Sequence, residues 1–294
     1  MDFILKCLPQ ELVNLIIKHN SSRIEEIRIR CGRQVILNMG NIEVVIKYII
    51  NQSDIIKILQ NMCNNSIYAY QNQIVSGFIT LPGGNRVGIS GNVVWNEGRV
   101  SNISYIYSLN IRIAHEIDGA SKDVLGYILD TKNNSIVNTL IVSPPGCGKT
   151  TMIRDIAKKI SNGIPEINYR GIDVCIIDER NEIAALSKGI PNNDVGTRTD
   201  IIDNVPKNIG IRMAVRAMAP KVIISDEIGN TDDADAVNYA VCSGVKCLFT
   251  AHGNCMDELM KNRELSRLIN MKLFNKIIFL DESVKGKVKQ IINL

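Results

Sequence analysis

The sequence feature that most constrains the fold is a short glycine-containing loop at residues 143–151, Ser-Pro-Pro-Gly-Cys-Gly-Lys-Thr-Thr. An apolar run at 139–142 precedes the loop, and apolar side chains at helical spacing follow it up to residue 160. A strand that leads through a glycine turn into a helix aims backbone N–H groups and the positive end of the helix dipole at one point. We therefore expect an anion to bind there.

The residue types in this loop favour a nucleoside triphosphate over a generic anion. Gly146 and Gly148 permit a tight turn and a close approach to the phosphates. Lys149 can reach the β- and γ-phosphates, and the Thr150 hydroxyl can bind Mg²⁺. Ser143 stands where the usual G-x-x-x-x-G-K-[ST] pattern has glycine, a departure that a small residue tolerates. The predicted nucleotide-binding residues are Pro144, Pro145, Gly146, Cys147, Gly148, Lys149, Thr150 and Thr151.

Composition narrows the class of protein without identifying a partner. Hydrophobic residues make up 45% of the 294-residue chain and charged residues 22%, which predicts packed cores. The net charge of +4 is too small to indicate nucleic-acid binding by itself. Eight scattered cysteines without a Cys-x-x-Cys pair, with only three histidines, argue against a zinc site and for reduced thiols. We see no signal peptide or membrane span and expect a cytoplasmic protein that reaches a membrane only through partners.

The pattern of elements changes near residue 118, where we place a domain boundary. Residues 1–118 mix short helices, β-branched strands and glycine turns, which predicts a smaller α+β domain with an antiparallel sheet. Residues 119–294 alternate strand and helix, which predicts an α/β, RecA-like P-loop core. Its parallel sheet should bind ligands at the carboxyl ends of its strands. The strands expected there are 139–142, 173–177, 222–225 and 245–250.

The first domain offers elements but no sharp chemistry. We expect helices at 10–19 and 53–62, a strand at 24–31, a hairpin of 35–38 with 42–46, and strands at 74–81, 86–90, 93–95 and 104–113. Its arginines are interpreted either as the lining of a groove or as the polar faces of half-exposed strands, the commoner situation. The six interpreted in this way are Arg28, Arg30, Arg33, Arg86, Arg99 and Arg112.

Two apolar strands of the second domain end in adjacent carboxylates. The run 222–227 ends in Asp226 and Glu227, which we predict to hold Mg²⁺ and to orient the attacking water, respectively. The alternative is a charged turn before a glycine. The run 174–180 ends in Asp178 and Glu179, which either face the same metal and water or form a solvated turn.

A histidine and several arginines complete the candidates. Strand 246–250 leads into His252, which is placed to sense the γ-phosphate, although lone histidines are usually structural. Arg212 and Arg216 lie four residues apart in a predicted helix at 211–218, so an anion between them would relieve their repulsion.

The anion between these arginines has two possible sources. Either Asp200 and Asp203 supply it, or the ATP of a neighbouring subunit does, with one arginine acting as a finger. Arg198 is a third candidate for that role.

Taken together, these motifs resemble the stage III sporulation protein AA family over nearly the whole chain. The residues that carry the resemblance are 144–151, 177–180, 198–200, 226–229 and 250–253, with 26–33 and 77–85 in the first domain. Their order is also similar to that of the traffic ATPases of secretion and pilus systems, in which the second acidic strand and the histidine serve the nucleotide site. By this resemblance Glu179 and His252 join Glu227, Arg212 and Arg216 as catalytic candidates.

The resemblance implies an ATPase of endospore-forming bacteria that uses ATP and Mg²⁺. It also implies a homo-oligomeric ring, a hexamer, with ATP at the subunit contacts. Its place would be the mother-cell cytoplasm, beneath a channel complex whose membrane components are separate proteins.

Two other functions stay open. A RecA-like motor on nucleic acid is suggested by the core type and the basic N-terminal strands, although we do not expect nucleic acid as a partner; DNA-stimulated, salt-sensitive hydrolysis would identify it. An ATP-binding scaffold that assembles the channel with negligible turnover is the non-enzymatic alternative.

Overall fold

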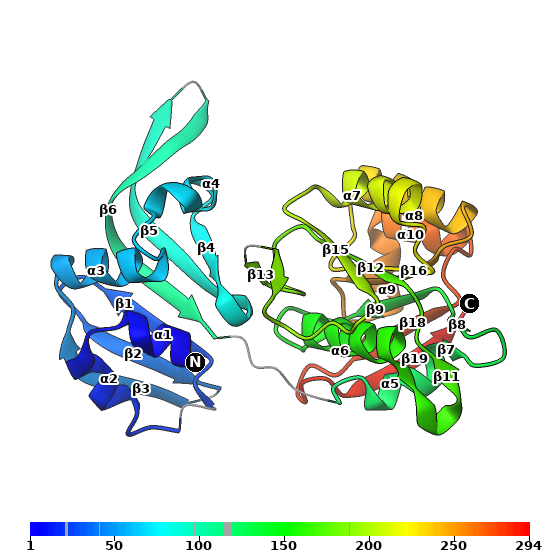
Figure 1. The fold of residues 1–294 in the computed structure, drawn as a ribbon, viewed down its shortest axis with the longest axis horizontal. Helices are drawn as coiled ribbons and strands as arrows, with labels where there is room; N and C mark the ends of the chain where they lie inside the picture. The colour runs from blue at the N-terminus through cyan, green and yellow to red at the C-terminus, as the bar shows by residue number, and fades with distance from the viewer. Residues whose placement is uncertain (21–22, 41, 97, 114–118, 188) are drawn as a thin grey trace. The chain divides into compact units, whose positions relative to one another are not determined.

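The computed structural model describes residues 1–294 except 21–22, 41, 97, 114–118 and 188, and it divides into two compact units, Met1–His115 and Glu116–Leu294 (Figure 1). The predicted boundary at residue 118 falls in the segment 114–118, outside the described residues.

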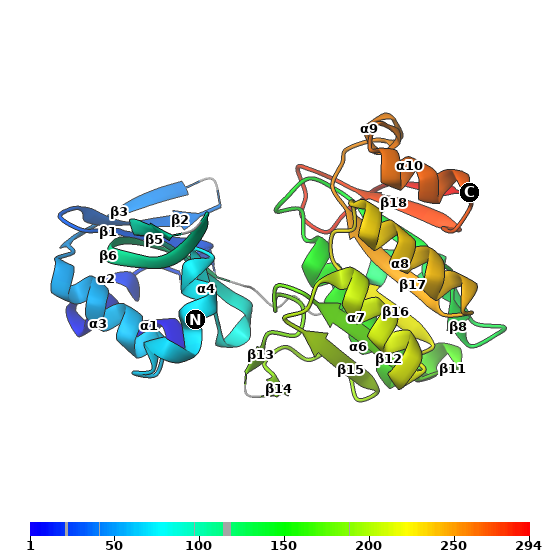
Figure 2. The same ribbon diagram turned by 90° about the horizontal axis from the view of Figure 1, so that it is seen from above.

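A six-stranded antiparallel sheet forms the first unit, in the order β3-β2-β1-β6-β5-β4. The strands are β1 (Glu26–Arg30), β2 (Gln34–Met39), β3 (Ile42–Ile49), β4 (Phe78–Leu81), β5 (Asn85–Asn96) and β6 (Arg99–Arg112). The helices are α1 (Asp2–Cys7), α2 (Gln10–Ile16), α3 (Gln52–Met62) and α4 (Gln71–Val75), and Figure 2 shows them on one face of the sheet.

Alternation along the strands explains this packing. Ile27 and Ile29 of β1 are fully buried, while Glu26, Arg28 and Arg30 are partly exposed, so one face of the sheet supplies the core. The predicted antiparallel sheet and the hairpin of β2 with β3 are confirmed. Residues 74–77 were predicted to begin a strand, but they end α4 and turn at Gly77, whose φ is +83°.

A seven-stranded sheet forms the second unit, in the order β15-β12-β16-β17-β9-β18-β19. All neighbouring strands are parallel except β19, which pairs antiparallel with β18. The strands are β9 (Thr139–Val142), β12 (Val174–Asp178), β15 (Thr199–Asp203), β16 (Val222–Ser225), β17 (Lys246–Ala251), β18 (Lys276–Leu280) and β19 (Val288–Asn293). The helices are α5 (Lys122–Ile128), α6 (Lys149–Asn162), α7 (Lys207–Met213), α8 (Thr231–Cys242), α9 (Met256–Lys261) and α10 (Arg263–Asn270).

Helices cover both faces of this sheet, which explains why its central strands are apolar throughout. Ile141, Ile176 and Ile224 pack with α5 and α6, whereas the intervening strand residues pack with α7, α8 and α10 (Figure 1). The four predicted strands are confirmed within one residue at each end. Three further strands, β15, β18 and β19, are not predicted from the sequence.

The predicted helix at 211–218 begins earlier than expected and changes its geometry. It starts with α7 at Lys207 and continues in π-helical form through Ala214–Met218. Ala219 then adopts a left-handed conformation with φ of +46°, directly before the buried Pro220.

Candidate nucleotide-binding site

The phosphate-binding loop lies between the buried strand β9 and helix α6, as the sequence predicts. Gly146 and Gly148 have φ of +80° and +92°, conformations that residues with a side chain rarely adopt. No side chain caps the first turn of the 14-residue α6, so its backbone N–H groups remain available to an anion. Ser143 does not have a positive φ, and serine therefore replaces glycine there without backbone strain.

The Lys149 side chain folds back onto the carbonyl groups of its own loop. Its side chain is 8% exposed, and Nζ donates to the carbonyl oxygens of Ser143 (2.6 Å) and Pro144 (3.0 Å). Burial lowers the pKa of Lys149, while the nearby Glu227 opposes that shift. Phosphate oxygens would give this poorly solvated ammonium a stronger, charged partner than carbonyl groups do.

The carboxyl end of β16 faces this loop with two acidic side chains. The Glu227 carboxylate lies 4.0 Å from Lys149 Nζ and 3.9 Å from Arg180 Nη1. Its backbone N–H donates to Thr250 Oγ1 at 2.8 Å, which ties the end of β16 to the end of β17. Glu227 thus stands beside the residue that would hold the phosphates, where a water-orienting carboxylate is needed.

Asp226 fits the predicted Mg²⁺ site. The residue is 6% exposed, and its Oδ1 atom is buried with no hydrogen-bond partner among the described residues. Lys207 Nζ lies 3.4 Å from Oδ1, which is an ion pair but not a directed hydrogen bond. Mg²⁺ prefers carboxylate and hydroxyl oxygens and keeps several waters and phosphate ligands. Asp226 and Thr150 supply such oxygens, and the described residues contain no cluster of three or more metal-binding side chains.

Asp178, at the end of β12, has neither of the two roles considered for it. It is fully buried, and its carboxylate accepts hydrogen bonds from the backbone N–H groups of Glu182 (2.8 Å), Ile183 (3.0 Å) and Ala184 (2.8 Å). Burial raises the pKa of Asp178, and these three donors oppose the shift. The carboxylate therefore holds its own loop together instead of facing a metal or solvent.

Glu179 and an unpredicted lysine form an ion pair beside Asp226. Lys207 Nζ donates to Glu179 Oε2 at 2.5 Å, and the lysine side chain is only 5% exposed. Lys207 is not among the site residues predicted from the sequence, because a single lysine after a proline belongs to no local sequence pattern that indicates burial. A second missed residue, the buried Arg154 of α6, donates to the carbonyls of Ile183 and Glu182.

The remaining candidates are dispersed. His252 is exposed directly after β17. The Arg212 guanidinium lies 5.1 Å from the Tyr239 ring, and Arg216 is exposed. Arg198 Nη1 donates to the carbonyl of Ser161 at 3.0 Å.

The two aspartates proposed as a counter-charge do not pair with the helical arginines. Among the described residues, neither Asp200 nor Asp203 forms an ion pair with Arg212 or Arg216. Their roles, and that of His252, stay predictions.

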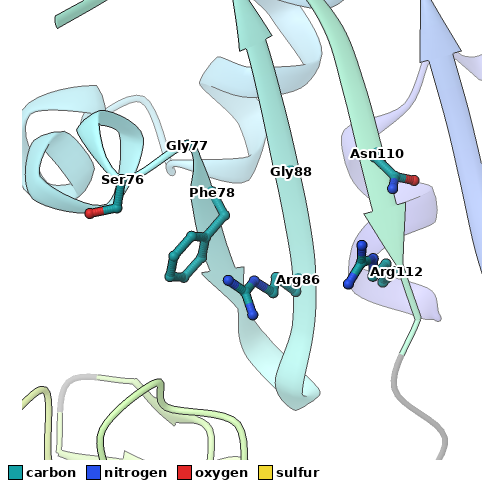
Figure 3. Close-up of a pocket in the computed structure, with 7 residues that line it drawn as sticks. All are labelled: Ser76, Gly77, Phe78, Arg86, Gly88, Asn110 and Arg112. Atoms are coloured by element: carbon teal, nitrogen blue, oxygen red, sulfur yellow. The ribbon is translucent and has the colours of Figure 1, made fainter. Parts of the chain in front are cut away.

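Two of the six N-terminal arginines line a pocket in the first unit (Figure 3). Arg86 and Arg112 lie directly opposite each other on β5 and β6, and the Arg86 guanidinium stacks 3.7 Å from the Phe78 ring centre. Arg28 instead pairs with Glu26 at 2.7 Å. The residues around the pocket are Ser76, Gly77, Phe78, Arg86, Gly88, Asn110 and Arg112.

This fold and its phosphate loop define a RecA-like P-loop core, preceded by a smaller α+β unit. The solved structure of the Legionella pneumophila ATPase DotB has a similar fold, with a TM-score of 0.63 and 14% identity, and the match covers 92% of this chain and 76% of that chain. The solved structure of the pilus retraction motor PilT with bound ADP is also similar, with a TM-score of 0.55 and 14% identity, and the match covers 92% of this chain and 77% of that chain.

The chain belongs to the family described as sporulation stage III, protein AA, whose sequence profile matches residues 2–294. Stage III sporulation protein AA of Bacillus subtilis (strain 168) is 37% identical over 295 residues, which cover 99% of this chain and 94% of that protein. Within the part of the chain that the structure describes, no helix has the length and apolar character needed to cross a bilayer.

Proposed function

We propose that this protein binds ATP with Mg²⁺ at the loop 143–151 and hydrolyses it. The observation that carries the proposal is the convergence of two strand ends on one point, where Lys149 of the phosphate loop and Glu227 after β16 lie 4.0 Å apart. Phosphoryl transfer to water requires an ammonium group that binds the phosphates and a carboxylate, a few ångströms away, that orients the attacking water.

Each residue has a defined task in this reaction. Lys149 and the N–H groups that open α6 bind the β- and γ-phosphates, and Glu227 accepts a hydrogen bond from the attacking water. The water oxygen bonds to the γ-phosphorus as the bond to the β–γ bridging oxygen breaks, releasing ADP and phosphate. Thr150 and Asp226 would hold the Mg²⁺, which neutralises the charge on the phosphate oxygens when bound.

We extend the proposal to the assembly in which the reaction takes place. The protein would act as a homo-oligomeric ring, a hexamer, in the mother-cell cytoplasm and drive or gate a sporulation channel through its membrane proteins. Family membership and the fold shared with DotB and PilT support this role. In the ring Arg212 or Arg216, neither of which forms an ion pair with Asp200 or Asp203, would reach the ATP of the neighbouring subunit.

The experiment that tests the proposal is steady-state ATP hydrolysis against protein concentration, with and without single-stranded DNA. Wild type is compared with Lys149→Ala and with Lys159→Ala, a control at the far end of the same helix. We expect specific activity that rises with protein concentration, is lost in Lys149→Ala, is kept in Lys159→Ala and is indifferent to DNA. DNA stimulation would favour a nucleic-acid motor. ATP binding without turnover, in the presence of the membrane partners, would favour a scaffold.

A further inference from the structure

Lys207 joins the two acidic strand ends of the site. It is the first residue of α7, and its ammonium donates to Glu179 after β12 at 2.5 Å and lies 3.4 Å from Asp226 after β16. The strands β12 and β16 are neighbours in the sheet, so one cation bridges two adjacent carboxyl ends. Asp233 in the first turn of α8, itself buried, adds a third carboxylate near the same ammonium.

Burying the Lys207 ammonium costs free energy, so we expect the charge to have a function. A buried ammonium loses its hydration, and an apolar side chain of similar size would fill the same volume without that loss. Burial by itself lowers the pKa of Lys207, but Asp226, Glu179 and Asp233 together reverse the shift, so its pKa is raised. The residue therefore remains charged.

The charge balance indicates what the lysine does. Without it, Asp226, Glu179 and Asp233 would repel one another at one edge of the sheet. The Glu179 side chain is 38% exposed and could turn toward solvent, whereas Asp226 is fixed by burial. The 3.4 Å contact with Asp226 leaves Oδ1 without a directed hydrogen bond, so this oxygen remains free to join a metal shell.

We infer that Lys207 is a positioning residue for the hydrolysis proposed above, and that Glu179 acts through it. In this arrangement Lys207 fixes Glu179 beside the buried Asp226, and Glu227 alone orients the water. Because the ammonium stands next to a Mg²⁺ ligand, it also weakens Mg²⁺ binding by charge repulsion. The inference rests on the proposed function.

The test compares Lys207→Met, which keeps the length of the side chain but removes its charge, with Lys207→Arg and with the exposed control Lys221→Met. We measure kcat and KM for ATP, and separately the binding of a fluorescent ATP analogue as Mg²⁺ is titrated and in EDTA. Circular dichroism and thermal unfolding establish that each variant is folded.

For Lys207→Met we expect kcat to fall about 10- to 100-fold while KM changes less than about threefold. The Mg²⁺ concentration for half-maximal analogue binding should fall at least about threefold, because a neighbouring positive charge is gone. Binding in EDTA should stay within about twofold of wild type. Lys207→Arg should restore most of kcat, and Lys221→Met should match wild type.

Slower turnover combined with tighter Mg²⁺ binding is the signature of a positioning cation, because a folding defect weakens both. A Lys207→Met protein with the turnover and Mg²⁺ response of wild type overturns the inference and leaves the proposed function intact. So does weaker Mg²⁺ binding in that variant. If wild type binds Mg²⁺ and the analogue but has no turnover, the Mg²⁺ titration alone tests the inference: tighter Mg²⁺ binding in Lys207→Met supports it, and unchanged or weaker binding overturns it. If wild type binds no nucleotide, the proposed function fails and the inference falls with it.

Discussion

An Asp-Glu dipeptide lies at the carboxyl end of each of the neighbouring strands β12 and β16, yet the two dipeptides make different contacts. Asp178 is surrounded by the backbone donors of its own loop, because the chain turns back at Asn181, whose φ is +54°. After β16 the backbone N–H groups of Glu227 and Ile228 donate to Thr250 instead. Asp226 is consequently left with a buried oxygen that no described N–H reaches. The path of the following loop, rather than the residue type, decides which carboxylate is free for a metal.

The two glutamates differ in the same way. Glu179 is engaged by Lys207 at 2.5 Å, whereas Glu227 has only looser contacts near 4 Å with Lys149 and Arg180. A carboxylate that must orient a water cannot be committed to a short ion pair. The contrast supports the proposal that Glu227 orients the water, and it can be tested on both pairs of residues.

The largest expected difference lies between the glutamates. Glu227→Gln should lower kcat about 10²- to 10⁴-fold, because it removes the carboxylate that polarises the water, while binding of a fluorescent ATP analogue stays near the wild-type level. Glu179→Gln should cost only about tenfold, since the amide oxygen still accepts from Lys207. Single-turnover hydrolysis and analogue binding measure both effects. Equal losses in the two variants, or loss of binding in Glu227→Gln, would contradict the contrast.

The aspartates should differ in stability. Asp178→Asn should lower the free energy of unfolding by about 1–3 kcal/mol, because one amide oxygen cannot satisfy three buried N–H groups. Asp226→Asn should change it by less than about 1 kcal/mol, because no described N–H depends on that carboxylate and Lys207 keeps Glu179. Urea unfolding followed by circular dichroism gives both values. A more destabilised Asp226→Asn would reverse the assignment of roles.

Metal removal should affect the aspartates in the opposite order. In wild type, EDTA should weaken ATP-analogue binding about tenfold, which corresponds to about 1.4 kcal/mol. Asp226→Asn should show little further loss in EDTA, because its Mg²⁺-dependent part of binding is already gone. A folded Asp178→Asn protein should respond to EDTA as wild type does. An Asp226→Asn variant that keeps the full Mg²⁺ effect would exclude this residue from the metal site.

The smallest effect concerns pH. The pKa of Asp178 is raised by burial, so the folded state binds this proton more tightly than the unfolded chain, where Asp titrates near 3.9. The contribution of Asp178 to stability is therefore full below about pH 4 and declines as the pH rises through its folded pKa. The difference in unfolding free energy between wild type and Asp178→Asn should shrink from pH 4 to pH 7. A difference that grows with pH would mean that the three N–H donors outweigh burial.

Local sequence patterns predict the phosphate loop and the acidic ends of the two strands, but not the contacts that their carboxylates make. The phosphate loop and the acidic ends of β12 and β16 could be predicted, because each depends on a short run of residues between a strand and a turn. The fate of Asp178 could not, since its partners are backbone donors whose positions depend on the loop path. Lys207 was invisible for a similar reason, because its partners lie on two strands distant in sequence.

The edge strand β15 was missed because its sequence, Thr-Asp-Ile-Ile-Asp, is polar at both ends. Arg198, a candidate finger, directly precedes β15, and its guanidinium donates to the carbonyl of Ser161.

The position of β9 in the sheet has a consequence for co-translational folding of the protein on the ribosome. The strand that carries the phosphate loop lies between β17 and β18, both made much later, and the turn after β18 donates from Gly286 to the loop carbonyl of Cys147 at 2.9 Å. Non-local parallel pairing of this kind forms slowly. A nascent chain thus exposes its phosphate loop without support until β17 and β18 have been made, and an anion that binds the loop would stabilise only the finished unit.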